Sequence, residues 1–184
     1  MSPNVSKRGR ADLCQVFADL GFCDGAEVGV WTGQFSKKLC KAIPGLDLLC
    51  VDPWCAYDEY REEKNNAERL EAAYREALVR LAPYRCTIWR TTSLEAASRV
   101  PDRSLDFVYI DGNHRRPFVD QDLEAWAPKV RIGGIVAGHD YSERAHEPFI
   151  EVKAAVDAFV RKHAIDPWFV LAGDKAPSFY WVVG

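Results

Sequence analysis

Apolar residues along this chain follow two patterns that alternate from end to end. Stretches with apolar residues three or four positions apart predict amphipathic helices. Short continuous apolar runs, such as Leu48 to Val51, predict strands that are buried on both faces. The expected helices lie near residues 13–20, 35–43, 67–81, 93–98, 117–130 and 152–160. The expected strands lie at 26–30, 48–51, 87–89, 107–110, 168–171 and 179–183, with one more between Gly133-Gly134 and His139-Asp140.

This alternation predicts a mostly parallel sheet with helices on both sides. Only a short turn separates the last two strands. Parallel neighbours need a longer crossover, so these two strands should form an antiparallel hairpin. The expected fold is α/β, with one Rossmann-like, doubly wound domain over residues 1–184 and a seven-stranded sheet. Residues 1–10, which include Lys7, Arg8 and Arg10, are expected to form a mobile terminus.

Composition excludes several classes of protein. The chain has 184 residues, of which 48% are hydrophobic, and a formal net charge of −3. A nucleic-acid binder would usually show a basic surplus. The six cysteines include no CxxC pair, and no apolar run is long enough to cross a bilayer or to form the core of a signal peptide. We therefore expect a cytoplasmic protein with reduced thiols that contacts neither nucleic acid nor membrane.

Two of the expected strands end in ionisable side chains. The run Phe107–Ile110 ends in Asp111-Gly112-Asn113-His114, and the strand after Gly133-Gly134 ends in His139-Asp140. In open α/β sheets, ligands bind at the carboxyl ends of the strands. These side chains therefore predict an active site at that edge of the sheet.

A glycine-containing turn after the first strand indicates a nucleotide-like cofactor. Between Glu27 and Gly33, glycine lets the backbone bend and a ligand approach it. Asp52 ends the next strand, where nucleotide-binding folds place an acidic residue for the ribose. Trp31 stands where the dinucleotide fingerprint has its middle glycine and would obstruct a pyrophosphate. A ribose-bearing ligand without a pyrophosphate fits better, and S-adenosylmethionine (SAM) is such a ligand.

Together these motifs resemble those of the class I SAM-dependent methyltransferases. The chain is most similar to their small-molecule and sugar O-methyltransferase branch, whose signature is a strand that ends in Asp-Gly-x-His. Each motif is weak alone, but their joint order along the chain is fairly specific. The matching residues are Glu27, Gly29, Gly33, Asp52, Ser93, Asp111 to His114, Gly133-Gly134 and His139-Asp140.

The resemblance implies where each part of the cofactor would bind. The turn that contains Glu27, Gly29 and Gly33 would hold the methionine portion. Asp52 would accept hydrogen bonds from the ribose, and Ser93 would lie near the adenine. Trp54 would either pack on the adenine or belong to the hydrophobic core, and both interpretations stay open.

Methyl transfer to a hydroxyl requires removal of the acceptor proton. His114 suits the role of general base, because histidine titrates near neutral pH; a solvated or helix-capping loop histidine is the alternative. Asp111 is expected to contribute to catalysis and to cofactor binding. As in metal-dependent relatives, Asp111, His139 and Asp140 would hold one divalent cation. Because His139 stands where an acid or amide is usual, the choice between Mg²⁺ and manganese, iron or zinc is open. A metal-free site, in which Asp111 and Asp140 are held by hydrogen bonds, is the alternative to a metal site.

The leading interpretation is an O-methyltransferase for a hydroxyl of a small metabolite or a sugar, including a glycan end. The Asp-Gly-Asn-His strand end differs from the Asn/Asp-Pro-Pro-Tyr motif of N-methyltransferases. The alternatives are a nicotinamide-dependent oxidoreductase, which Trp31 argues against, a metal-dependent hydroxylase-like relative, and a non-catalytic cofactor-binding member of the fold. We expect the chain to lack the N-terminal helical extension with which many small-molecule methyltransferases cover the acceptor. The acceptor pocket would then be open, which suits a glycan end, or would be completed by residues 53–66 or by the second subunit of a homodimer.

Overall fold

The computed structural model describes residues 2–56, 66–143 and 150–184. The strands are β1 (Asn4–Ser6), β2 (Asp24–Val28), β3 (Asp47–Val51), β4 (Cys86–Trp89), β5 (Leu105–Ile110), β6 (Val130–Gly138), β7 (Trp168–Leu171) and β8 (Ser178–Val182). The helices are α1 (Arg10–Asp19), α2 (Gln34–Ala42), α3 (Ala67–Leu81), α4 (Ser93–Ala97), α5 (Arg116–Trp126), which the 3-10 turn Ala127–Lys129 follows, and α6 (Val152–Lys162). These elements follow the predicted α/β alternation closely.

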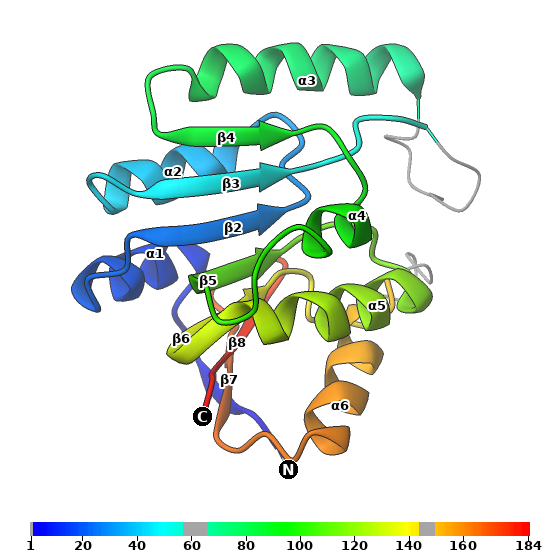
Figure 1. Cartoon of the computed structure of the whole chain (residues 1–184). Coiled ribbons are helices and arrows are strands. Elements are labelled where there is room, and N and C mark those ends of the chain that lie inside the picture. The colour runs from blue at the N-terminus through cyan, green and yellow to red at the C-terminus, as the bar shows by residue number, and fades with distance from the viewer. Residues whose placement is uncertain (1, 57–65, 144–149) are drawn as a thin grey trace.

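The strands form one sheet in the order β1-β7-β8-β6-β5-β2-β3-β4. Helices α1, α2 and α3 pack on one face of this sheet, and α4, α5 and α6 pack on the other (Figure 1). Each face has its own hydrophobic core. Along β5, Phe107 and Tyr109 point into the core on the side of α1, α2 and α3, whereas Val108 and Ile110 point into the core on the side of α4, α5 and α6. A strand whose side chains alternate between two cores is apolar throughout, which explains the continuous apolar runs of the sequence.

Most neighbouring strands are parallel, as the sequence predicts. β2 pairs in parallel with β3 and with β5, β3 pairs with β4, and β5 pairs with β6. β8 runs antiparallel to both β6 and β7. The doubly wound fold with an antiparallel hairpin at its carboxyl end is therefore confirmed.

The predicted number of seven strands is wrong, because β1 adds an eighth at the edge of the sheet. β1 pairs in parallel with β7, and Val5 lies opposite Val170. Its sequence, Asn-Val-Ser, is short and mostly exposed, so it carries no apolar pattern. Unpaired backbone groups at a sheet edge can recruit such a segment whatever its side chains. Residues 4–6 therefore belong to the sheet rather than to a mobile terminus.

β6 begins earlier than the sequence predicts. Gly133 and Gly134 lie inside this strand rather than before it. The pairing of β6 with β5 shifts its register between Leu105 and Phe107. A Cβ on Gly134 would lie 2.4 Å from the carbonyl oxygen of Asp106. The two glycines thus mark an irregularity where two strands come close together.

The strand order reverses beside β2. From β2 the chain proceeds outward to β3 and β4, and then returns to β5 on the other side of β2. At such a reversal the connections after the two central strands diverge and leave a crevice for ligands. Gly29 follows β2 here, with a φ of 90°, and a Cβ on it would lie 2.0 Å from the carbonyl oxygen of Asp111. Only glycine allows the two strand ends to meet so closely.

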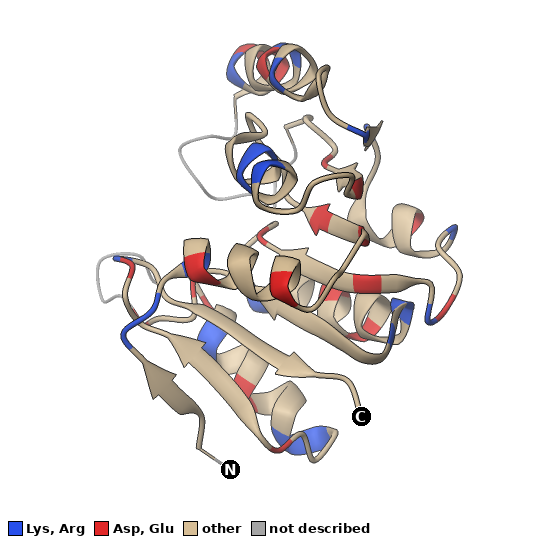
Figure 2. Cartoon of the chain, turned by 90° about the vertical axis from the view of Figure 1, so that its left-hand side faces the viewer, with Lys and Arg blue, Asp and Glu red and all other residues tan. Residues whose placement is uncertain are grey.

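Charged residues are distributed over the helices and connections. Lys and Arg residues are interspersed with Asp and Glu on several elements (Figure 2). Within the described ranges, no helix is both long enough and apolar enough to cross a membrane.

Candidate active site

A cavity of about 670 Å³ opens at the carboxyl ends of β2, β3, β5 and β6. Its lining includes most of the residues that the sequence predicts for the site, namely Glu27, Gly29, Asp52, Trp54, Ser93, Asp111, His114, His139 and Asp140. Gly33 does not belong to the lining. With a φ of 73°, it provides the turn into α2.

Asp52 connects the ends of β2 and β3. Its carboxylate accepts the backbone N–H of Trp31 at 2.9 Å and that of Trp54 at 2.8 Å. Both tryptophans have left-handed backbones, with φ values of 51° and 40°. Because non-glycine residues adopt this conformation at a cost, the carboxylate supports an unusual backbone while it also lines the cavity. Asp52 is thus a structural residue as well as a candidate ribose ligand.

Trp54 belongs to the hydrophobic core. Its side chain is only 1% exposed, its indole N–H donates to the Trp31 carbonyl at 2.8 Å, and its ring lies 4.9 Å from that of Tyr74. Trp54 is also among the residues that line the cavity. The core interpretation of Trp54 is therefore supported, and a contact with adenine stays a prediction.

Ser93, at the start of α4, links this helix to α5. The indole N–H of Trp126 donates to its hydroxyl oxygen at 2.8 Å. Burial raises the pKa of Asp122 to about 7, and Asp122 lines the cavity beside Ser93. The sequence interpretation missed Asp122. Its position between Val119 and Trp126 on the apolar face of α5 was the available signal.

Glu27 lies deep beside the glycine turn. Its side chain is 1% exposed, and it accepts a hydrogen bond from the Ser36 hydroxyl. Burial raises the pKa of Glu27 to about 8, because desolvation disfavours the ionised carboxylate. The protein without ligand therefore favours the neutral acid at this position near neutral pH.

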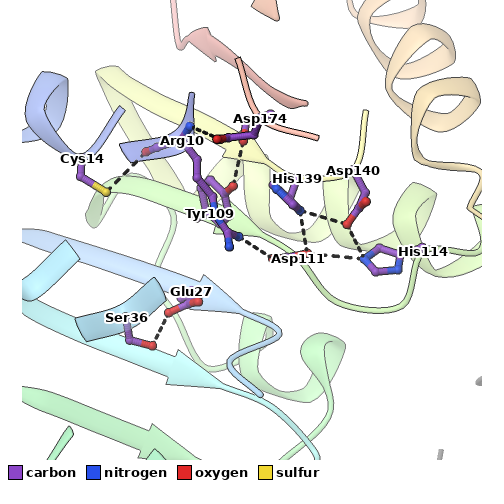
Figure 3. Close-up of polar contacts among 11 residues, drawn as sticks. Arg10, Cys14, Glu27, Ser36, Tyr109, Asp111, His114, His139, Asp140 and Asp174 are labelled. Atoms are coloured by element: carbon purple, nitrogen blue, oxygen red, sulfur yellow. Dashed lines mark hydrogen bonds and ion pairs between the residues drawn. The ribbon is translucent and has the colours of Figure 1, made fainter. Parts of the chain in front are cut away.

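Asp111, His114, His139 and Asp140 point toward one another from the ends of β5 and β6 (Figure 3). His114 Nε2 lies 3.4 Å from Asp111 Oδ1 and 3.3 Å from Asp140 Oδ2. His139 Nδ1 lies 3.7 Å from Asp111 Oδ1 and 3.0 Å from Asp140 Oδ2. We call these four residues the Asp–His cluster. Two imidazoles between two carboxylates can share protons, exchange them with a ligand, or bind a cation.

The donor atoms of Asp111, His139 and Asp140 are close enough to bind one ion, since they all lie within 4.8 Å of one another. Each ligand atom lies about 2.0–2.2 Å from the metal ion that it binds, so two ligand atoms of one ion are separated by up to about twice that distance. Carboxylate oxygens and an imidazole nitrogen also form a chemically suitable donor set. The residues therefore fit a divalent cation, and the 3.0 Å contact of His139 with Asp140 equally fits a direct hydrogen bond.

Arg10 reaches the cavity from the first turn of α1. Its Nη1 atom lies 3.6 Å from Asp111 Oδ2, and its guanidinium lies over the ring of Phe35, 5.0 Å from the centroid. The expectation of a mobile terminus is therefore wrong for this residue, which lies in α1. No motif marks Arg10, because its neighbours in the cavity are distant in sequence.

A family model described as a methyltransferase domain matches residues 26–141. The chain belongs to this methyltransferase-domain family. The matched segment contains the glycine turn, Asp52 and the whole Asp–His cluster, whereas Arg10 precedes it. In sequence, the chain is 27% identical over 124 residues to the uncharacterized protein y4gI of Sinorhizobium fredii. The aligned part is 65% of this chain but only 13% of that longer protein.

Solved O-methyltransferases share the fold of this methyltransferase domain. TomG of Streptomyces achromogenes, involved in tomaymycin synthesis and solved in complex with SAM, superposes with a TM-score of 0.65 at 15% identity, over 95% of this chain and 80% of TomG. A Bacillus cereus O-methyltransferase in complex with SAH superposes with a TM-score of 0.66 at 13% identity, over 95% of this chain and 80% of that enzyme. The O-methyltransferase NovP superposes with a TM-score of 0.67 at 18% identity, over 95% of this chain and 79% of NovP. The predicted class I methyltransferase fold is therefore confirmed.

Proposed function

We propose that this methyltransferase domain transfers a methyl group from SAM to a hydroxyl of a small metabolite or a sugar. One observation carries the proposal. A single cavity joins a glycine turn and Asp52, which suit a ribose-bearing cofactor, to the Asp–His cluster, which suits removal of a proton. The structural neighbours solved with SAM and SAH support the choice of cofactor.

Different parts of the cavity would bind different parts of the cofactor. The turn between Glu27 and Gly29 would hold the methionine portion, Asp52 the ribose hydroxyls, and the region of Ser93 the adenine. When bound, SAM supplies an electrophilic methyl group on a positively charged sulfur. The acidic lining of the cavity complements that charge.

His114 is the proposed general base. Its Nε2 atom lies between Asp111 and Asp140, so both carboxylates would stabilise the positive charge that the imidazole gains with the acceptor proton. A carboxylate beside a histidine also holds the ring in one orientation. Transfer of the acceptor proton to His114 leaves the acceptor oxygen able to attack the methyl carbon as the carbon–sulfur bond breaks.

Asp111, His139 and Asp140 are the proposed ligands of a divalent cation. When bound, such a cation would orient the acceptor hydroxyl and lower its pKa. The imidazole of His139 favours manganese, iron or zinc over Mg²⁺, which prefers oxygen ligands. Non-haem iron oxygenases bind iron through two histidines and one carboxylate, and the Asp–His cluster as a whole contains two histidines and two carboxylates. The second candidate function is therefore a metal-dependent oxidation, which Fe²⁺-dependent turnover without methyl transfer would reveal.

A small acceptor is more consistent with the surface than a nucleic acid. The net charge is −3, and basic residues are interspersed with acidic ones on several of the elements seen in Figure 2. Nucleic-acid binders instead collect Lys and Arg on one face.

Calorimetric titration with SAM, with and without EDTA, tests the proposal. Micromolar binding would support the methyltransferase function and would justify a screen of hydroxyl acceptors. Weaker binding in EDTA would indicate that the metal and cofactor sites are coupled. If SAM did not bind under either condition, the proposal would fail, and nicotinamide cofactors would be titrated next.

A further inference from the structure

The lining of the cavity has an unequal distribution of charge. Five side chains with carboxyl groups contribute to it: Asp52, Asp111 and Asp140, together with Glu27 and Asp122, whose pKa values are raised by burial. Among the described residues of the lining, Arg10 is the only lysine or arginine. The sulfonium and ammonium groups of SAM suit such an acidic cavity, but its α-carboxylate does not. That carboxylate needs a cation or N–H donors, since a buried charge without partners is costly.

Arg10 lies beside the part of the cavity proposed for the methionine portion. Its guanidinium lies over Phe35, in the first turn of α2, which directly follows the glycine turn. No side chain caps that helix, so its N-terminus adds a favourable field for an anion. Figure 3 shows Arg10 next to Tyr109 and Asp111, with Glu27 on the neighbouring strand.

The contacts of Arg10 leave its guanidinium able to bind a ligand. Its ion pair with Asp111 is 3.6 Å long, which exceeds a hydrogen bond, and a guanidinium has five N–H donors. The side chain is 30% exposed. Its backbone is held firmly, because the N–H of Arg10 donates to Asp174 Oδ2 at 2.7 Å. Because the backbone is already ordered, binding of an anion by Arg10 does not carry the further entropic cost of ordering this segment.

We infer that Arg10 binds the α-carboxylate of the methionine portion of the cofactor and so selects cofactors that carry this group. The inference rests on the proposed function, since it assumes that SAM occupies this cavity. A planar guanidinium matches the geometry of a carboxylate and can bind both oxygens. Arg10 is a binding residue in this assignment and takes no part in proton transfer.

Titration with two ligands tests the inference. SAM carries the carboxylate, whereas decarboxylated SAM keeps the sulfonium and the amine but lacks it. Arg10→Ala should weaken the binding of SAM by about 10- to 100-fold, as expected for loss of a charge-assisted hydrogen bond. The same substitution should change the affinity for decarboxylated SAM by less than about 3-fold, because the lost interaction is absent from that complex. The titrations are made in EDTA, so that a metal at Asp111 does not contribute.

Two further variants control for charge and for folding. Arg8→Ala removes the same charge from an exposed neighbour that does not line the cavity, and it should leave both affinities unchanged. Arg10→Lys keeps a positive charge but lacks the planar guanidinium that can bind both oxygens of a carboxylate. It should therefore retain part of the preference for SAM over decarboxylated SAM. This variant carries the test if thermal unfolding shows that Arg10→Ala is not folded.

The possible results separate the two proposals. If folded Arg10→Ala lost affinity for both ligands equally, Arg10 would act through Asp111 or the fold. If it lost affinity for neither, Arg10 would not contribute to cofactor binding. Either result would make the inference wrong. If the wild-type protein bound neither ligand, the proposed function itself would fail.

Discussion

The two halves of the cavity are built by different means. The half at the ends of β2 and β3 depends on backbone geometry: Gly29 allows a close approach to Asp111, and the Asp52 carboxylate holds the N–H groups of Trp31 and Trp54. The half at the ends of β5 and β6 depends on side chains. There two carboxylates and two imidazoles lie between 3.0 and 3.7 Å apart.

This difference indicates how each half should respond to change. Backbone geometry does not titrate, so the cofactor half should keep its shape without metal and should respond to pH only through its carboxyl groups. The Asp–His cluster changes charge with every proton or cation that it binds. Its activity should therefore respond strongly to substitution, pH and chelation, and the predictions below test that contrast.

The largest effect should follow loss of a side chain from the Asp–His cluster. His114→Ala should reduce turnover by about 10²–10⁴-fold, the usual contribution of a general base. SAM affinity should change little, because cofactor binding belongs mainly to the other half. Steady-state kinetics with an acceptor, together with a SAM titration, measure both quantities. His163→Ala, which removes an exposed histidine outside the cavity lining, is the matched control, and full-rate turnover by His114→Ala would exclude the base role.

Glu27 lies in the cofactor half but titrates, so it is an exception to the contrast. Burial raises its pKa from the ordinary 4.5 to about 8. Between these values the unfolded chain loses the proton while the folded protein keeps it, so stability falls as pH rises. Glu27→Gln removes this dependence. Between pH 5 and pH 8 the free energy of unfolding of the wild type should therefore fall by a few kcal/mol more than that of the variant.

Urea unfolding of the ligand-free protein at both pH values measures this difference. Glu68→Gln, at an exposed position in α3, should leave the pH dependence unchanged. Equal pH profiles for the wild type and Glu27→Gln would show that the carboxyl group is ionised in the folded protein.

Asp52 tests the backbone half directly. Asp52→Ala should weaken SAM binding by about 1–3 kcal/mol, the cost of unpaired hydrogen-bonding groups. It should also lower the unfolding temperature, because it releases the N–H groups of Trp31 and Trp54. Calorimetry and thermal unfolding separate these effects, with Asp19→Ala on the exposed end of α1 as the control. An unchanged SAM affinity would contradict the ribose assignment and leave Asp52 a purely structural role.

The smallest effect should come from Trp54. Trp54→Phe removes the hydrogen bond to the Trp31 carbonyl and should cost about 1 kcal/mol of stability. If Trp54 is purely a core residue, SAM affinity will not change. A loss of affinity in the folded variant would instead show that the ring contacts the cofactor.

Much of the fold and of the cavity was predictable from local patterns. The apolar runs of β3 and β5 and the helical spacing of α3 identified these elements directly, because each records the burial of its own side chains. The strand ends placed Asp52, Asp111 and Asp140 at one edge, since parallel strands share their direction. The polar strand β1 gave no such signal and was missed.

The sequence by itself thus determined the α/β order, the parallel core with its hairpin, and the chemistry at the strand ends, because these follow from periodicity over a few neighbouring residues. Only the tertiary structure decided that Arg10 faces Asp111, that Asp122 lines the same cavity as Ser93, and that Asp52 accepts hydrogen bonds from two tryptophans with left-handed backbones. These arrangements join residues that are distant along the chain, or depend on one carboxylate's exact direction. Neither the distance between them nor that direction is encoded in a local pattern of polarity.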